Sequence, residues 1–297
     1  MADFATRPAF IALALFLSSC SAAPQPDAPS RESGAPTPDA IVAAERAFAA
    51  DGLERGVKAS FLAYSADEAI VFAPDPASAH TVFGARPDRD ANDSRPPLIW
   101  WPLYAGISRS GDLGFTTGPY AVGEERRGHY FTIWRKQADG NWKWILDAGV
   151  GADASGEAAQ GSDVSYLPTS AEGAASRDAA MAEVSSHESA LAVAAREDLS
   201  SAYGPFMDDD ARLHSEGPPP AIDAPARAAA LAARPARLEM APIGGGASDA
   251  GDMVWTYGEA RAPGAASTGY YVRLWQYRSN GWRLVFDEYL PPADGAQ

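Results

Sequence analysis

GHYFTIWR, at residues 128–135, is followed by DGNWKWILD at 139–147, and the same kind of stretch returns as GYYVRLWQ at 269–276 and NGWRLVFD at 280–287. Aromatic and β-branched residues dominate each copy, which is typical of half-buried strands. An Asp-Gly or Asn-Gly dipeptide stands where two such strands would turn back on each other. Each copy therefore predicts a long aromatic β-hairpin.

The hairpins belong to a longer pattern that occurs twice. Residues 60–69 match 202–211, and residues 111–118 match 251–258, in the same order and at a nearly constant separation. A constant separation between matching blocks is the signature of an internal repeat. The chain is therefore predicted to contain two copies of one fold.

Two helices are expected before the first hairpin. Thr37-Pro38-Asp39 supplies capping residues and a proline suited to a first helical turn. Apolar residues then recur at helical spacing until Gly52, and again from Leu53 to Tyr64. The second copy is expected to open with a helix over about 176–193.

Strands and one ambiguous segment separate these helices from the hairpin. Residues 69–72 predict a short strand, and the Pro-, Asp- and Arg-rich stretch 74–97 predicts a loop. The intensely apolar stretch 98–104 is either a strand or a lid over a cavity, and residues 113–120 predict another strand.

These elements predict five regions along the chain. Their expected bounds are a signal peptide at 1–19, a flexible tether at 20–37, a first domain at 38–150, a linker at 151–175 and a second domain at 176–291. The tether and the linker are predicted from runs of Pro, Ala, Gly and Ser without a helical or strand period.

Cys20 is the only cysteine in the chain, and it follows an apolar run at 9–17. That run is too short to span a bilayer and is typical of a signal peptide. Leu17-Ser18-Ser19-Cys20 resembles the bacterial lipobox, in which the cysteine is lipidated and the peptide is cut before it. The alternative is an ordinary signal-peptidase site after Ala22 or Ala23. The resemblance implies a bacterial cell-envelope protein anchored to a membrane through lipid on Cys20, with Ser21 compatible with the periplasmic face of the outer membrane.

The net charge of −15 limits the classes of partner. Nucleic-acid backbones and anionic lipid surfaces both require a basic face, so we expect neither as a partner. The four histidines are scattered without carboxylates at ligand spacing, which predicts no metal site. No phosphate-binding loop or nucleophile elbow is present either, so no cofactor is expected.

His129 and Asp147 form the first candidate site. A three-residue turn with Gly140 in the left-handed position would place both side chains on one face of the hairpin. They are then either a general base with the group that orients it, or a hydrogen-bonded structural pair. The second copy has Tyr270 in place of the histidine and keeps Asp287, which favours a structural or ligand-contact role for the aspartate.

Aromatic residues provide the second group of candidates. Trp100, Trp101 and Tyr104 lie in the ambiguous apolar segment and are interpreted as a pocket wall, and Tyr64 near the end of the second helix could face the same pocket. The aromatic residues of the hairpin itself are expected to pack in the core.

Two helices, a short strand, a loop and three long strands resemble the NTF2-like superfamily and, within it, the DUF4440/SnoaL-like bacterial branch. The residues that carry the resemblance are Gly128-His129-Tyr130, Trp134-Arg135, Asp139-Gly140-Asn141-Trp142 and Asp147 in the first copy, and Gly269-Tyr270-Tyr271, Trp275, Gly281-Trp282 and Asp287 in the second. The resemblance implies an α+β fold with two cone domains, in each of which a curved antiparallel sheet packs on N-terminal helices and leaves a pocket.

The resemblance leaves the activity open. Some members, such as ketosteroid isomerase and scytalone dehydratase, are enzymes, and many bind ligands or partners without catalysis. The Asp base and the Tyr/Asp oxyanion pair of ketosteroid isomerase match no motif position in this chain, so the resemblance assigns no catalytic residue. Members often dimerise through their sheets, so two tandem copies imply either a monomer that is an intramolecular pseudo-dimer or a homodimer.

Three functional hypotheses follow. The first is a non-catalytic, lipid-anchored protein that binds a small apolar or amphipathic molecule, with Tyr64, Trp100, Trp101, Tyr104, His129 and Asp147 as candidate contacts. The second is an isomerase, dehydratase or hydrolase that uses His129 and Asp147 for proton transfer. The third is a protein-interaction scaffold at the membrane, whose pockets are filled by its own side chains.

Overall fold

A computed structural model describes residues 36–89 and 94–293 of the chain. Cys20, the expected signal peptide and most of the expected tether lie outside the described residues. The first half of the described chain consists of α1 (Asp39–Arg55), α2 (Val57–Tyr64), β1 (Ser65–Phe72), β2 (Pro76–Ser78), α3 (Ala79–Gly84), β3 (Leu98–Trp100), β4 (Tyr104–Ile107), β5 (Leu113–Val122), β6 (Glu125–Lys136), β7 (Trp142–Gly151) and β8 (Ser165–Tyr166).

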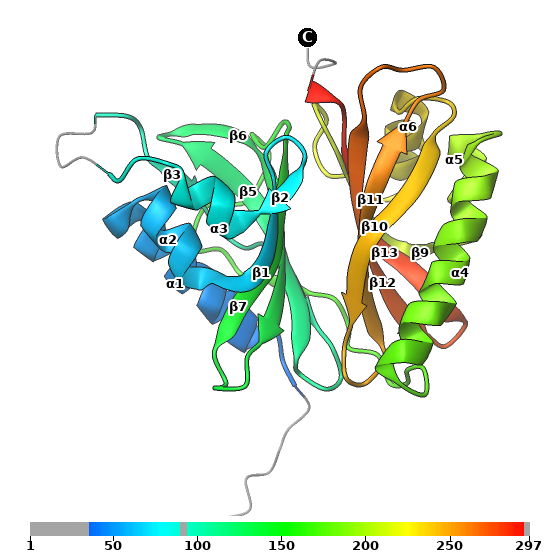
Figure 1. Ribbon diagram of the computed structural model, residues 1–297, viewed down its shortest axis with the longest axis horizontal. Coiled ribbons are helices and arrows are strands. Elements are labelled where there is room, and N and C mark those ends of the chain that lie inside the picture. Colours follow the sequence, from blue (N-terminus) through cyan, green and yellow to red (C-terminus); the bar gives the residue numbers. More distant parts are fainter. Residues whose placement is uncertain (1–35, 90–93, 294–297) are drawn as a thin grey trace, which may run out of the picture. The chain divides into compact units, whose positions relative to one another are not determined.

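The second half follows a similar plan (Figure 1). It consists of α4 (Arg177–Ala195), α5 (Leu199–Ala202), β9 (Met207–Ser215), α6 (Ala224–Ala233), β10 (Glu239–Ala247), β11 (Met253–Arg261), β12 (Gly269–Arg278) and β13 (Gly281–Leu290). The fold is thus α+β, and each half has helices followed by a sheet of its own.

The two sheets have the same order over five strands, with β1-β7-β6-β5-β4 in the first corresponding to β9-β13-β12-β11-β10 in the second. The first has the order β2-β1-β7-β6-β5-β4-β8 with β3 also paired to β5, and the second has the order β10-β11-β12-β13-β9. Both sheets contain a parallel strand pair at the same place, whereas an antiparallel arrangement was expected. The strand that follows the helices, β1 or β9, runs parallel to the last hairpin strand of its half, β7 or β13.

Helix α1 continues past the expected stop at Gly52 and ends at Arg55, with Gly56 as its C-cap. Gly56 has a φ angle of 87°, which favours glycine, and its N–H donates to the carbonyl oxygen of Gly52 at 3.0 Å. Gly52 itself is buried against Trp100, and a β-carbon there would lie 2.7 Å from the indole ring. Its small size therefore serves helix packing rather than helix termination.

Segments expected to lack regular structure also fold. Within the expected loop 74–97, Ser78 caps the short helix α3 by accepting a hydrogen bond from the backbone N–H of Thr81. Within the expected linker, β8 pairs in parallel with β4.

The first hairpin has the expected turn but not the expected register. Gly140 has a φ angle of 86°, and the flanking residues Gln137 and Asn141 hydrogen-bond across the turn, as a three-residue loop requires. A β-bulge then interrupts the pairing where Ile145 is inserted into β7, between the pairs Ile133–Leu146 and Trp134–Trp144. The extra residue changes the face to which every later side chain of β7 points.

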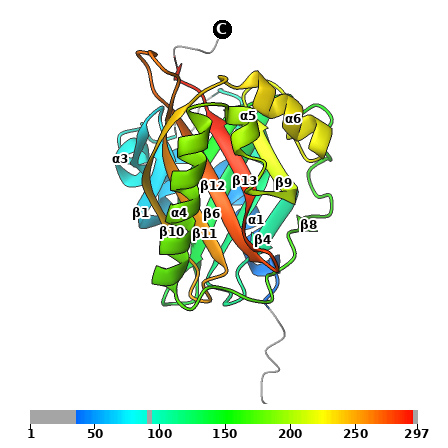
Figure 2. The ribbon, with the colours of Figure 1, turned by 90° about the vertical axis from the view of Figure 1, so that its right-hand side faces the viewer.

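Each sheet is covered by helices on one face. In the first half, α1 and α2 lie along the sheet, and in the second half α4 runs across the strands (Figures 1 and 2). Side chains from α1–α3 and the inner face of the first sheet form one buried cluster, and those of α4–α6 and the second sheet form another.

A third buried cluster joins the other faces of the two sheets. At its centre the rings of Phe131 and Phe286 stack with centroids 3.7 Å apart. Two turns make reciprocal hydrogen bonds beside it: the Arg109 N–H donates to Asp252 at 2.8 Å, and the Asp249 N–H donates to Asp112 at 3.0 Å. Such reciprocity is characteristic of two-fold related surfaces.

None of the helices in the described residues is long and apolar enough to cross a membrane.

Candidate functional site

A cavity of about 190 Å³ lies between the helices and the inner face of the first sheet. Aromatic and aliphatic side chains form most of its wall, and Asp147 is the only charged residue among the described residues that line it. The lining residues are Phe48, Phe61, Val71, Phe72, Leu98, Trp100, Tyr120, Tyr130, Asp147, Ala148 and Gly149. An apolar cavity with one or two directed polar groups is the usual form of a small-molecule site.

Asp147 is held in place by the neighbouring strand. It lies directly opposite Thr132 in β6, and the Thr132 hydroxyl donates to its carboxylate at 2.5 Å. Burial raises the pKa of Asp147 to about 7, with a further contribution from the nearby Glu45, while the hydrogen bond from Thr132 opposes the rise. Both protonation states are therefore populated near neutral pH.

Tyr130 lines the cavity, but its hydroxyl oxygen is buried and has no surface open to the cavity. The hydroxyl lies near Thr116 and makes no hydrogen bond of ordinary geometry. Burial raises the pKa of Tyr130 well above its ordinary value, so this hydroxyl keeps its proton. Asp147 is therefore the polar group that the cavity offers to a ligand.

Glu45 lies beneath the cavity, fully buried on α1. It accepts hydrogen bonds from the indole N–H groups of Trp100, at 2.6 Å, and Trp134, at 3.2 Å, and from the hydroxyl of Thr116. Burial raises the pKa of Glu45 to about 7, although these three hydrogen bonds favour its charged form. The cluster fixes the ring of Trp100 as one wall of the cavity.

The second half repeats this buried carboxylate. Glu188 on α4 accepts from the Thr256 hydroxyl at 2.6 Å and from the Trp275 indole at 2.8 Å. Glu188 also bonds the guanidinium of Arg273 at 2.5 Å, and no cation among the described residues occupies this place in the first half.

The space beside Asp287 is filled by cations. Arg273 lies directly opposite Asp287 in the sheet and bonds it at 2.8 Å, while Arg234 reaches it at 2.5 Å. The Tyr203 hydroxyl completes the network with a bond to Asp287 at 2.9 Å. Although burial alone would raise it, the pKa of Asp287 lies below its ordinary value because both guanidinium groups stabilise the carboxylate.

The candidates from the sequence are distributed over several places. Trp100 and Asp147 line the cavity together, and Tyr64 packs on Phe48, one of its wall residues, with ring centroids 5.3 Å apart. Trp101 is buried elsewhere and donates to the carbonyl of Ala158.

Tyr104 lies in the cluster between the two sheets. The guanidinium of Arg212 covers its ring at 3.7 Å.

The expected pairing of His129 with Asp147 is wrong. His129 lies opposite Val150, and Asp147 lies opposite Thr132. Thr132 is three positions after His129 in β6, so Asp147 and His129 point to opposite faces of the sheet. The bulge at Ile145 is the cause, because it reverses the alternation predicted from an unbroken strand.

His129 instead belongs to a buried polar group on the other face of the sheet. Its Nε2 lies 3.2 Å from a carboxylate oxygen of Glu157, and its ring lies 5.4 Å from that of His214. His214 contacts Glu288 at 3.3 Å. In the part of the chain that the structure describes, no three His, Cys, Asp or Glu side chains are placed to bind a metal ion.

Glu45, Thr132 and Tyr130 were not among the sequence candidates. Glu45 could nevertheless have been recognised from the sequence, because it interrupts the apolar stripe of Ile41 and Phe48 on one face of α1. Glu188 does the same between Val184 and Leu191 on α4. A carboxylate at a core position of both copies is the pattern that would have identified the cluster.

No protein-family model matches the chain, and no curated protein matches it. Solved structures show a partial likeness. A protein of unknown function with a cystatin-like fold from Nostoc punctiforme is 11% identical, with 38% of this chain and 92% of that chain covered and a TM-score of 0.32.

Two further solved structures are NTF2-like proteins. One from Pseudomonas putida, of unknown function, is 13% identical over 41% of this chain and 92% of its own, with a TM-score of 0.32. One from Salmonella enterica serovar Typhimurium is 12% identical over 40% of this chain and 95% of its own, with a TM-score of 0.31. These likenesses say nothing about ligand or activity.

Proposed function

We propose that the first half binds a small, mainly apolar molecule in the aromatic cavity, with one polar group of that molecule at Asp147. The observation that carries the proposal is a carboxyl group with a pKa of about 7 in a cavity of about 190 Å³ whose wall is otherwise mainly aromatic and aliphatic. An apolar cavity of about 150 Å³ holds a benzene-sized molecule. The cavity thus fits a monocyclic ligand.

The carboxyl group of Asp147 defines what such a ligand must offer. Protonated Asp147 donates a hydrogen bond, and ionised Asp147 accepts one. A ring that carries a carbonyl or hydroxyl group meets these requirements. The ion-pair network around Asp287 leaves the second half in a structural role.

Binding is tested with cyclohexanone and phenol as probes, by ligand-observed NMR and by thermal shift. We expect both to bind the protein. Thr132→Arg, which copies the arrangement of Arg273 and Asp287, is expected to abolish binding because its side chain occupies the cavity. Asp67→Asn removes an exposed carboxylate outside the cavity and serves as the matched control. Absence of binding by any monocyclic probe, or equal binding by the Thr132→Arg protein, would overturn the proposal.

The location of the protein is a separate part of the proposal. The apolar run before Leu17-Ser18-Ser19-Cys20 supports a lipid-anchored protein of the bacterial cell envelope. The test is metabolic labelling with an alkyne fatty acid in a bacterial host. We expect the native chain to incorporate the alkyne fatty acid and the Cys20→Ser chain not to incorporate it. An unlabelled native chain would contradict the anchor.

A second candidate function is acid–base catalysis by Asp147 alone, because a carboxyl group with a pKa of about 7 suits proton transfer at neutral pH. The measurement is exchange of the α-hydrogens of cyclohexanone in D₂O, followed by NMR. Faster exchange in the native protein than in Asp147→Asn would favour an enzyme. Binding without faster exchange favours the non-catalytic function.

A further inference from the structure

His129 and His214 meet beside the cluster that joins the two sheets. His129 is on β6 of the first half and His214 on β9 of the second, and their rings lie 5.4 Å apart. Both side chains are almost completely buried, and each has a carboxylate partner. Nε2 of His129 lies 3.2 Å from Glu157, and Nδ1 of His214 lies 3.3 Å from Glu288. The contact between the halves therefore contains four ionisable groups.

The two-fold counterpart of this contact is an aromatic pair. By the register of the sheets, Phe72 in β1 occupies the position that His214 occupies in β9. Ala148 in β7 likewise occupies the position of Glu288 in β13. The Phe72 ring lies 5.8 Å from that of Tyr270, the counterpart of the other histidine. The fold therefore does not require an imidazole and a carboxyl group at this contact.

The pair formed by His214 and Glu288 is enclosed by other ionisable groups. The side chains of both residues are buried, so water does not screen their charges. The ionisable groups near the pair and its neighbour His129 come from every element around them. They are His129 on β6, Asp147 on β7, Arg212 on β9, Asp287 on β13, Tyr120 on β5 and Arg234 after α6, with Glu157 and Asp153 beside His129.

The pair is neutral overall only when it holds one titratable proton. It is then either a neutral imidazole with a carboxylic acid or an imidazolium with a carboxylate. A second proton leaves a buried positive charge near His129, Arg212 and Arg234. Loss of the first proton leaves a buried negative charge near Asp147 and Asp287. Because an unbalanced buried charge is costly, the contact is most stable with one proton on the pair.

The pKa values of the two residues are shifted in the directions that keep this single proton. The pKa of His214 lies well below its ordinary value of 6.5, because burial and the nearby cations disfavour the imidazolium. The pKa of Glu288 lies well above its ordinary value of 4.5, because burial and the nearby carboxylates disfavour the charged form. In the unfolded chain the two residues together hold two protons below pH 4.5, one between 4.5 and 6.5, and none above 6.5.

Proton counts in the folded and unfolded chains decide how this contact depends on pH. Below pH 4.5 the unfolded chain holds more protons than the folded chain, so acid destabilises the folded state. Above pH 6.5 the folded chain holds more, so rising pH destabilises it. Between the two values the opposite effects of His214 and Glu288 cancel, and the contribution of the pair is constant.

We propose that His214 and Glu288 form a one-proton latch between the two halves. The latch holds His214 against His129 while the pair keeps one proton, and it weakens when the pair gains a second proton or loses the first. It does not depend on a ligand in the aromatic cavity.

The test is urea denaturation of the protein at pH 3.5, 5.5 and 8.5. His214→Phe/Glu288→Ala places the residues of the first half at both positions and removes the titration. Relative to this variant, the folding equilibrium constant of the native protein should be highest at pH 5.5. It should fall by up to about tenfold for each pH unit below 4.5 or above 6.5, which is the effect of one proton. A ratio that is the same at all three pH values would overturn the proposal.

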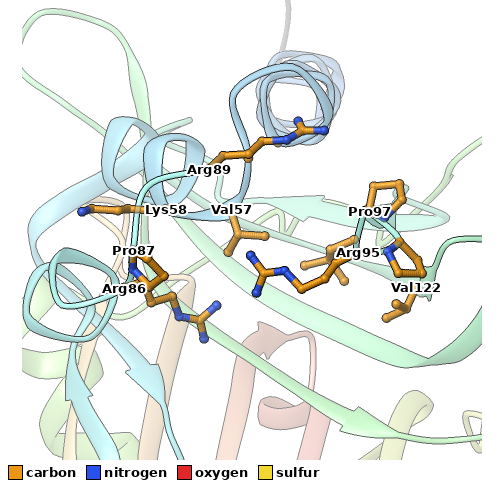
Figure 3. Close-up of a pocket in the computed structure, with 12 residues that line it drawn as sticks. Val57, Lys58, Arg86, Pro87, Arg89, Arg95, Pro97 and Val122 are labelled. Carbon is orange, nitrogen blue, oxygen red and sulfur yellow. The ribbon is translucent and has the colours of Figure 1, made fainter. Parts of the chain in front are cut away.

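Glu288→Gln keeps the shape of the side chain and provides a second test if the double variant does not fold. The native protein should lose stability relative to Glu288→Gln as pH rises above 4.5. A stability difference that stays constant from pH 5.5 to pH 8.5 would contradict the latch. Lys58→Gln is the control, because Lys58 lies on α2 at another pocket of the first half (Figure 3) and pairs with the exposed Asp88 at 2.9 Å. It should follow the native protein at all three pH values.

Discussion

Thr132 and Arg273 occupy the same register position in the two halves, each directly opposite an aspartate of the neighbouring strand. Thr132 gives Asp147 one hydrogen bond and leaves space beside it, whereas Arg273 gives Asp287 an ion pair and fills that space. The two aspartates consequently differ in pKa in opposite directions. This difference separates a half with a candidate ligand cavity from a half with an internal ion-pair network.

Replacing Arg273 by threonine should destabilise the protein strongly. The change leaves Glu188 and Asp287 buried with fewer partners, and breaking a buried ion pair costs about 3–5 kcal/mol. Urea denaturation measures the free energy of unfolding. As a matched control, Arg261→Thr removes the exposed pair with Glu239 and should cost less than about 1 kcal/mol. Equal losses in the two variants would contradict the account.

Replacing Asp147 by asparagine should change how stability depends on pH. The folded-state pKa is raised from 3.8 to about 7, so the folded chain holds this proton more tightly than the unfolded chain. The contribution of Asp147 is most favourable in acid and is lost as pH rises from 3.8 to about 7. Asparagine does not titrate, so Asp147→Asn should gain stability relative to the native protein as pH rises through this window, by about 4 kcal/mol in total at about 1.4 kcal/mol per pKa unit.

The measurement is urea denaturation of both proteins at pH 4 and pH 8. Asp67→Asn, at an exposed position, should follow the native protein at both pH values. A difference between Asp147→Asn and the native protein that does not change with pH would contradict this account, because it would show that the pKa of Asp147 is the same in the folded and unfolded chains.

The two buried glutamates should respond differently to replacement by glutamine. Glu188→Gln removes the charge that pairs with Arg273 and should cost about 3–5 kcal/mol. Glu45 accepts only neutral donors, and its pKa of about 7 means that it is already partly neutral, so Glu45→Gln should cost about 1–2 kcal/mol. Thermal and urea unfolding of the two variants at pH 7 provide the comparison, and a larger loss for Glu45→Gln would refute this ranking.

The stacked rings of Phe131 and Phe286 should couple the two sheets. Each alanine substitution removes a fully buried ring and should cost about 3–5 kcal/mol. In a double-mutant cycle the coupling energy should be about 1 kcal/mol. Additive losses would show that the two rings contribute independently, and the faces of the sheets would then not be joined at this point.

Much of the fold can be predicted from the sequence because its signals are local. Gly140 adopts the left-handed conformation that the turn requires, and the hairpin strands on either side form as their alternation predicts. Helix α1 extends beyond the prediction because the role of Gly52 depends on Trp100, which is distant in sequence. Local periodicity does not contain that contact.

The candidate site is less predictable for the same reason. One inserted residue, Ile145, reverses the faces of β7, and its type gives no sign of the bulge. The pairing of Arg234 with Asp287 joins residues far apart in the chain, so no motif predicts it. Asp147 lines the cavity, but its partner in the sheet is Thr132 rather than the predicted His129.

The most direct measurement is a carboxyl ¹³C NMR titration that follows Asp147 and Asp287 in the same native protein. Asp147 should titrate at about pH 7, while Asp287 should titrate below 3.8, because only the second half has guanidinium groups beside its aspartate. Addition of phenol should perturb the Asp147 resonance and leave that of Asp287 unchanged. Two aspartates that titrate together near pH 4, and do not respond to phenol, would contradict the division into an open and a filled half.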